Sequence, residues 1–287
     1  MEVKLHARDL ELLRDFLDAM ERAGAECFLV GAGARVLGFD QRWGLRGARA
    51  TLDWDFAVRM ESWEQWARLV SQLIGGARAR FSQSRALHRF THTNGAVVDL
   101  VPYGGLEAPN GEITWPDRSS MNVLGFAASE PGRERLVLDQ GLVVPVAATP
   151  SLALLKLHAY RERRQRGERK DIQDFDWFLR NYEAAGNELR VHDELAEELL
   201  DARLEIDDGG AALLGSDVAR GHDSVVIDAV RAILGEARDP WSRVIADLFV
   251  GVVGVDEGRV DRRRKEASRR FAAFELGLAL GRGAEPS

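Results

Sequence analysis

Residues 49–56 read RATLDWDF and place two aspartates on either side of a tryptophan. The run LDWDFAV (52–58) predicts a β-strand, because aromatic and β-branched residues dominate it and no strand breaker interrupts it. Side chains alternate along a strand, so we expect Asp53 and Asp55 on one face and Trp54 and Phe56 on the other. Two carboxylates this close repel each other unless a positive charge lies between them, and a divalent cation suits that position.

Strand and helix signals alternate around this run in the first half of the chain. We expect a helix over 7–23, a strand over 26–31, a helix that is capped by Ser62 and ends at Gly75, and a hairpin over 86–104 whose strands are joined across Thr93-Asn94-Gly95. Short strands over 135–139 and 142–147 close this half, and beyond Thr149 the periodic segments are helical. The pattern predicts an α/β (α+β) domain with a small mixed sheet over residues 1–148 and an all-helical domain over 149–287.

Composition limits the class of protein. The chain has 287 residues, of which 45% are apolar and 30% are charged, so it is long enough for two globular domains. Its net charge of -7 gives no general attraction to nucleic acid, which leaves a local basic groove as the alternative. The single cysteine, Cys27, excludes an intramolecular disulfide and a cysteine-rich zinc site. We expect neither a signal peptide nor a membrane span, and therefore a cytoplasmic protein.

A third aspartate lies within an apolar strand signal. Asp99 is part of GAVVDLVPY (95–103), and a carboxylate in such a run must be ion-paired, hydrogen-bonded or bound to a metal ion. If this strand lies beside LDWDFAV, then Asp53, Asp55 and Asp99 converge on one patch. Three carboxylates of this kind are typical ligands of Mg²⁺ or Mn²⁺, with phosphate and water in the remaining positions.

A phosphate-binding turn is also indicated. The segment FLVGAGARVLG (28–38) predicts a strand, a glycine-containing turn and then a helix. The backbone N–H groups of Gly31, Ala32 and Gly33 would then face an anion at the start of that helix. A tight turn needed only for packing is the alternative interpretation of this segment.

These motifs together resemble a known superfamily. Gly31, the Asp-x-Asp pair at 53–55 and the later Asp99 resemble the nucleotidyltransferases that include DNA polymerase beta. Two further segments resemble the AbiEii-like branch of toxin–antitoxin nucleotidyltransferases: the Arg-x-Thr of RATLDWDF, and ALLKLHAYRERRQRGERKDIQDFDWFL over 153–179. The resemblance covers roughly residues 25 to 180. It departs from the superfamily pattern at Ala32, where glycine or serine is usual.

The resemblance implies roles for individual residues. Asp53, Asp55 and Asp99 are implied to be catalytic and to bind the metal ions. Lys156 is implied to contact the triphosphate, while Lys170 and Asp171 orient the nucleotide or the acceptor, with Asp174 as the alternative to Asp171. The implied nucleotide-binding set is Gly31, Ala32, Gly33, Thr51, Lys156, Lys170 and Asp171. Only four of the 39 basic residues are lysines, and two of the four fall in this motif, which favours a role for them.

The implied activity is metal-dependent transfer of a nucleoside monophosphate from an NTP, such as ATP, to an acceptor hydroxyl with release of pyrophosphate. The branch implies an RNA acceptor such as tRNA, a toxin function and a cognate antitoxin. Two alternatives stay open: a small hydroxylated acceptor of the aminoglycoside type or a protein side chain, and a catalytically vestigial NTP-binding module.

Other features have simpler interpretations. His88 and His92 lie four apart on a strand without a third histidine or a cysteine, so we expect structural or exposed histidines rather than a metal site. The run RVDRRRKEASRR (259–270) is interrupted by acidic residues, which favours a solvated helix face over a nucleic-acid surface. Trp63, Trp66 and Trp177 are spaced as in the apolar face of a helix and are expected in the core.

Overall fold

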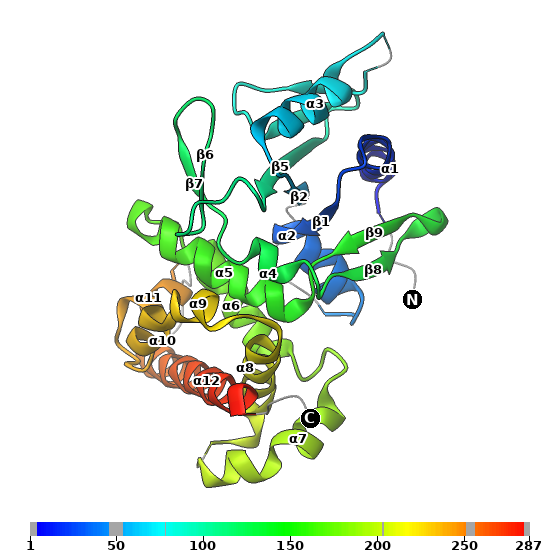
Figure 1. The fold of residues 1–287 in the computed structure, drawn as a ribbon. Coiled ribbons are helices and arrows are strands. Elements are labelled where there is room, and N and C mark those ends of the chain that lie inside the picture. Colours follow the sequence, from blue (N-terminus) through cyan, green and yellow to red (C-terminus); the bar gives the residue numbers. More distant parts are fainter. Residues whose placement is uncertain (1–4, 46–53, 78, 203, 251–255, 284–287) are drawn as a thin grey trace. The chain divides into compact units, whose positions relative to one another are not determined.

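The computed structural model describes residues 5–45, 54–77, 79–202, 204–250 and 256–283. The chain divides into two compact units, Met1–Ala148 and Thr149–Ser287. The first unit contains a mixed sheet with helices, and the described part of the second contains helices only (Figure 1). The predicted fold class, an α/β first half followed by a helical second half, is confirmed. The predicted site residues Thr51 and Asp53 lie outside the described residues.

One mixed seven-stranded sheet organises the first unit, in the order β3-β4-β5-β2-β1-β9-β8. Its strands are β1 (Cys27–Val30), β2 (Trp54–Arg59), β3 (Phe81–Gln83), β4 (Arg89–His92), β5 (Val97–Tyr103), β8 (Glu134–Val137) and β9 (Val143–Val146). Strand β2 runs antiparallel to β1 and parallel to β5. The segment that carries the Asp-x-Asp motif therefore lies inside the sheet, next to the strand that carries Asp99.

The alternation of β2 explains its place in the core. Trp54 and Phe56 are buried, whereas Asp55 between them is half-buried. Helix α1 (Ala7–Ala23) packs on the apolar face, where the rings of Phe16 and Phe56 lie 4.5 Å apart between centroids. The indole nitrogen of Trp54 donates a hydrogen bond of 3.2 Å to Asp9 of α1. The apolar residues thus face α1 and leave the opposite face of β2 to Asp55.

Local signals determine the ends of helix α3 and the turn of a hairpin that forms part of this sheet. Helix α3 (Trp63–Ile74) begins at Ser62, whose side chain accepts a hydrogen bond from the Gln65 backbone N–H, and it ends at Gly75, as predicted. Strands β4 and β5 form the predicted hairpin, and its turn contains Gly95 with φ +82°. Glycine tolerates this left-handed conformation because it lacks a Cβ atom. The segment between β5 and β8 contains β6 (Glu112–Thr114), β7 (Ser120–Asn122) and α4 (Phe126–Ser129).

The second unit is built from helices. They are α5 (Thr149–Arg163), α6 (Lys170–Asn181), α7 (Glu188–Asp201), α8 (Gly209–Gly221), α9 (Ser224–Asp228), α10 (Arg231–Ala237), α11 (Arg243–Leu248) and α12 (Glu257–Gly283). Residues 224–234 are divided between α9 and α10. Helix α8 begins with Gly209 and Gly210, although glycine is a poor helix former.

Close packing against α12 explains the glycines of this helix pair. A Cβ atom on Gly277 of α12 would lie 1.8 Å from the Ala212 carbonyl oxygen of α8, and one on Gly215 would lie 2.1 Å from the Phe274 carbonyl oxygen. The backbones of α8 and α12 can approach this closely only where side chains are absent. Tertiary contact between the helices therefore outweighs the weak helix propensity of the α8 sequence.

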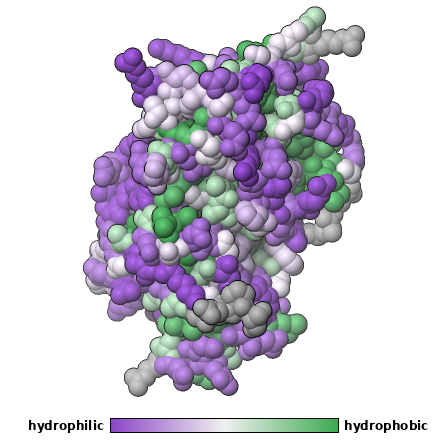
Figure 2. Space-filling model, viewed as in Figure 1, coloured by the Kyte–Doolittle hydropathy of each residue, from purple (hydrophilic) through white to green (hydrophobic). Residues whose placement is uncertain are grey.

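The surface of the chain is mostly polar on the face drawn in Figure 2, where hydrophobic residues form smaller, separate patches. Among the described helices, none combines the length and the apolar character that crossing a membrane requires. The 27-residue helix α12 is long enough, but arginines and acidic residues fill its first half.

Candidate active site

Two of the predicted aspartates face each other across neighbouring strands. Asp55 of β2 and Asp99 of β5 are direct partners in the parallel register. Paired residues of adjacent strands project their side chains to the same face of a sheet. Asp99 is buried and Asp55 is half-buried. The sheet therefore brings together two carboxylates whose mutual repulsion requires a nearby positive charge.

Gly31 lies against the first of these carboxylates. Strand β1 ends at Val30, the partner of Asp55, and helix α2 (Gly31–Ala34) starts at the next residue. A Cβ atom on Gly31 would lie 2.2 Å from Oδ2 of Asp55, and the Gly31 φ is +67°. Both the contact and the backbone conformation therefore require glycine at this position. The predicted strand–turn–helix is present, and it places the start of the helix beside Asp55.

The helix that follows this turn is unusual. Helix α2 continues as a π-helix over Arg35–Gln41, in which Arg35 and Asp40 form a buried ion pair of 2.7 Å. π-helical turns are rare and occur often at functional sites.

The three residues of the predicted phosphate-binding turn differ in exposure: Gly33 is buried, while Gly31 and Ala32 are half-buried.

Arg89 supplies a positive charge at the second carboxylate. It lies on β4 directly opposite Asp99 in the antiparallel register. Its Nε donates to Oδ1 of Asp99 at 2.8 Å, and its Nη2 donates to Oδ2 at 2.6 Å. Of the three environments expected for Asp99, namely an ion pair, a hydrogen bond or a metal ion, the structure contains an ion pair with an arginine. Two-point pairing of this kind is among the strongest hydrogen-bonded contacts of a carboxylate.

Sequence reasoning did not single out Arg89, although a signal was present. Arg89 and Asp99 lie five residues on either side of Asn94. A hairpin whose strands are joined across Thr93-Asn94-Gly95 is centred on Asn94, so residues at equal distances from Asn94 lie opposite each other. The register of the predicted hairpin would have identified this ion pair.

The predicted residues of the second unit form a separate cluster within that unit. The Nζ of Lys156, on α5, lies 3.1 Å from Asp171 and 2.8 Å from Asp174, both on α6. Arg163 also pairs with Asp171, at 3.3 Å. Burial alone would lower the pKa of Lys156, but the charges of Asp174 and Asp171 raise it above its ordinary value. Lys170, by contrast, is exposed at the first position of α6.

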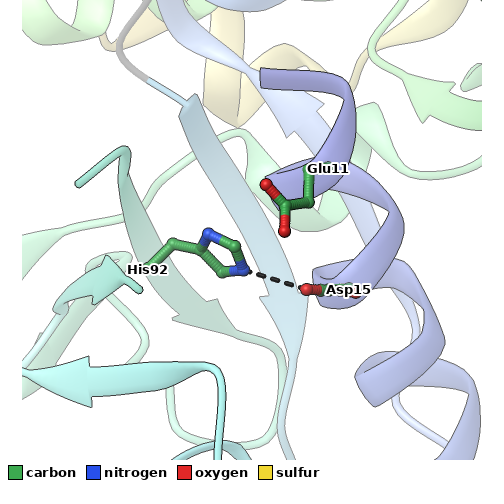
Figure 3. Close-up of side chains that lie close together, drawn as sticks. All are labelled: Glu11, Asp15 and His92. Carbon is green, nitrogen blue, oxygen red and sulfur yellow. Dashed lines mark hydrogen bonds and ion pairs between the residues drawn. The ribbon is translucent and has the colours of Figure 1, made fainter. Parts of the chain in front are cut away.

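One other group of described residues has the composition of a metal site. Glu11 and Asp15 of α1 and His92 of β4 point toward one another (Figure 3), with ligand atoms within 4.8 Å. The His92 Nε2 lies 2.9 Å from Asp15. Arg80 also bonds to both Glu11 and Asp15. The contacts of Arg80 and His92 with these carboxylates form an ion network that links α1 to the sheet. The His92 side chain is buried.

Two surface cavities of the first unit lie elsewhere. One, of about 540 Å³, is lined by residues of α1 and of the end of α3, and the other, of about 560 Å³, includes Cys27 and Arg133. Neither is lined by Asp55 or Asp99. The candidate site is therefore defined by the charged side chains of Asp55, Asp99 and Arg89, which lie outside these two cavities.

The chemistry of the donor set fits a hard divalent cation. Asp55 and Asp99 offer carboxylate oxygens, which Mg²⁺ and Mn²⁺ prefer. The guanidinium of Arg89 on Asp99 demonstrates that this position accommodates a positive charge. Gly31 keeps the adjacent backbone free of a side chain, as close approach of a phosphate requires.

Comparison with known proteins identifies the family of this chain. A family described as "Nucleotidyl transferase AbiEii toxin, Type IV TA system" matches residues 42–252, a range that includes Asp55, Asp99 and Lys156 but not Gly31. The chain belongs to this AbiEii nucleotidyltransferase toxin family. No curated protein matches the sequence.

Two solved structures show a remote similarity. A Thermotoga maritima CCA-adding enzyme complexed with tRNA is 12% identical, with a TM-score of 0.24 over 96% of this chain and 83% of that chain. A CCA-adding enzyme in an apo form is 11% identical, with a TM-score of 0.27 over 96% of this chain and 84% of that chain.

Proposed function

We propose that this nucleotidyltransferase moves a nucleoside monophosphate from an NTP, such as ATP, to an acceptor hydroxyl in a Mg²⁺- or Mn²⁺-dependent reaction. The observation that carries the proposal is the pairing of Asp55 with Asp99 in register, with Gly31 in contact with Asp55. These residues provide metal ligands and a close backbone approach at one place on the sheet.

In the proposed reaction, the acceptor oxygen forms a bond to the α-phosphorus of the NTP. The bond from that phosphorus to the bridging oxygen breaks, and pyrophosphate leaves with the electron pair. Asp55 and Asp99, together with Asp53 of the same motif, would hold the metal ions, and Asp99 would accept the hydroxyl proton. Metal ions bound there would supply positive charge to the phosphates and would lower the pKa of the attacking hydroxyl.

Backbone N–H groups of Gly31, Ala32 and Gly33 are proposed to bind the phosphates, and Thr51 is proposed to contact the nucleotide. The nucleotide contacts of Lys156, Lys170 and Asp171 stay predictions. The ammonium group of Lys156 contacts two carboxylates, and an ammonium has three N–H donors, so it can also donate to a phosphate. Lys170 is exposed.

For the acceptor we propose RNA, with tRNA as the first candidate, and for the biological role a toxin that has a cognate antitoxin. The family description, which names a toxin of a type IV system, supports the biological role. The 3′ end of a tRNA offers a free hydroxyl, which is the group that the proposed reaction requires. The similarity to the CCA-adding enzymes is too remote to support the choice of acceptor.

The proposal is tested by incubating the protein with each α-labelled NTP, Mg²⁺ and total RNA. Wild type is compared with Asp55→Asn and with Asp18→Asn, a control at an exposed aspartate of α1. Label in RNA with wild type and Asp18→Asn, but not with Asp55→Asn, is the expected result. Pyrophosphate release only with small hydroxylated molecules or proteins would replace the RNA acceptor. No release with any acceptor, despite NTP binding, would favour the vestigial module.

A further inference from the structure

The ion pair of Arg89 and Asp99 lies where the proposed function, on which this inference rests, requires a metal ion. We infer that Arg89 competes with the divalent cation for Asp99, so that the guanidinium and the metal ion exchange at one carboxylate. Arg89 is then a positioning residue that sets the cation concentration at which the site fills.

The geometry of the pair makes the two cations mutually exclusive. Arg89 bonds both oxygens of Asp99, at 2.8 and 2.6 Å. A carboxylate whose two oxygens both accept short charge-assisted bonds must lose at least one of them to ligate a metal ion. Two positive charges at one carboxylate would also repel each other. Binding of the metal therefore includes displacement of Arg89.

Solvent exposure allows this exchange. The side chain of Arg89 is 48% exposed, whereas that of Asp99 is 12% exposed. A guanidinium at this depth can turn into water, and the metal ion then replaces it as the positive charge beside the buried Asp99. Lys156 in the second unit, with a side chain only 10% exposed, has no comparable route out of its carboxylate pair.

The pair also explains how the sheet tolerates its acidic site. Asp55 and Asp99 are direct neighbours in the parallel register, and like charges in such positions destabilise a sheet. Arg89 offsets this repulsion from the next strand. Its removal should therefore make the protein less stable in the presence of a chelator but more receptive to a divalent cation.

The test is calorimetric titration of Mn²⁺ into the full chain, with thermal unfolding in EDTA as a second measurement. The proteins are wild type, Arg89→Gln, Arg89→Lys and Arg59→Gln. Arg59 is a matched control on β2, because its side chain is 50% exposed and pairs with Glu61 and Glu130. Asp55→Asn identifies which part of the Mn²⁺ binding belongs to this site, as distinct from Glu11, Asp15 and His92.

We expect Arg89→Gln to bind Mn²⁺ about tenfold more tightly than wild type, the effect of one lost charge-assisted pair. Arg89→Lys should fall between the two, since lysine keeps the charge but cannot bond both oxygens in the same fork geometry. Arg59→Gln should match wild type. In EDTA, Arg89→Gln should unfold at a lower temperature than wild type.

Equal Mn²⁺ affinities for wild type and Arg89→Gln, or weaker binding by Arg89→Gln, would overturn the inference and leave the proposed function intact. If Arg89→Gln does not fold, the Mn²⁺ affinity of Arg89→Lys is compared with that of wild type, and an affinity equal to or weaker than that of wild type overturns the inference. Absence of any Mn²⁺ binding that Asp55→Asn removes would overturn the metal-dependent function and this inference together.

Discussion

Each unit of the chain contains two neighbouring aspartates with a basic side chain bonded to at least one of them, yet the two clusters differ in their access to water. In the sheet, the side chain of Arg89 is 48% exposed and pairs with Asp99 beside Asp55. In the helical unit, the side chain of Lys156 is 10% exposed and that of its partner Asp171 is 3% exposed. The same charges are thus open to exchange in one cluster and enclosed in the other. We expect substitutions in the open cluster to affect chemistry and those in the enclosed cluster to affect stability.

The largest effect is expected from Asp99→Asn in the open cluster. Asparagine keeps the size of the side chain and can still accept a hydrogen bond from Arg89, but it removes the anionic metal ligand. Transfer activity should fall about 10⁴-fold, which corresponds to ~5 kcal/mol of lost transition-state stabilisation. The rate of pyrophosphate release measures it.

Urea unfolding gives the control for Asp99→Asn. The free energy of unfolding should change by less than about 1 kcal/mol, since Arg89 is half-exposed and stays hydrated. If Asp99→Asn greatly lowers the free energy of unfolding but leaves the specific activity unchanged, the cluster in the sheet serves stability and not chemistry.

Lys156→Met should give the next largest effect, and on stability. Methionine fills a similar volume but leaves the buried Asp171 and the half-buried Asp174 without the charge of Lys156. The free energy of unfolding should fall by about 3 to 5 kcal/mol, as when one partner of a buried ion pair is removed. Urea unfolding of the full chain measures the loss.

Lys170→Met is the matched control for Lys156→Met, because Lys170 is the exposed lysine of the same motif. It should change the unfolding free energy by no more than about 0.5 kcal/mol. If Lys156→Met changes the free energy of unfolding as little as Lys170→Met does, the ion pairs of Lys156 do not stabilise the helical unit.

Gly31→Ala should affect both chemistry and stability. The added Cβ would meet Oδ2 of Asp55 at 2.2 Å, and alanine disfavours the φ of +67° found there. We expect the unfolding free energy to fall by about 2 to 3 kcal/mol and the transfer activity to fall with it. Gly24→Ala is the control, since it has a similar φ of +59° but no atom within 4 Å of the added Cβ. Equal effects of the two substitutions would attribute the loss to backbone strain alone.

A smaller effect, on pH dependence, is expected from His158 in the helical unit. Its side chain is buried. Burial, reinforced by the charge of Arg161, lowers the pKa of His158 to about 3. Between that pKa and the ordinary value near 6.5, the unfolded chain binds a proton that the folded chain does not, so stability falls as pH decreases through this range.

From pH 7 to pH 5 this single group should remove about 2 kcal/mol of the free energy of unfolding. The His158→Leu variant should lack this part of the pH dependence, and urea unfolding at both pH values checks it. His88→Gln, at a half-buried histidine, should retain the dependence of wild type. Identical pH profiles for wild type and His158→Leu would contradict the prediction.

Local sequence determined the elements whose signals lie within a few residues. Ser62 and Gly75 limit α3, because a side-chain cap and a glycine stop act on the adjacent backbone. The Asn94-Gly95 turn sets the hairpin of β4 and β5, and alternation in LDWDFAV separates Asp55 from the core. The residue types of the candidate site were evident from the same local patterns.

The tertiary structure alone decided the relations between distant segments. Helix α8 forms despite its glycines, because glycine allows the close backbone contact with α12 that stabilises it. Lys156 meets both Asp171 and Asp174 only because α5 packs on α6, and Asp55 faces Asp99 only because β2 pairs with β5 in this register. Periodicity determines which face of an element is apolar, whereas register and helix packing depend on the summed burial of many residues. For that reason the sequence determined the chemistry of these charged groups, and only the fold decided which of them are open to exchange.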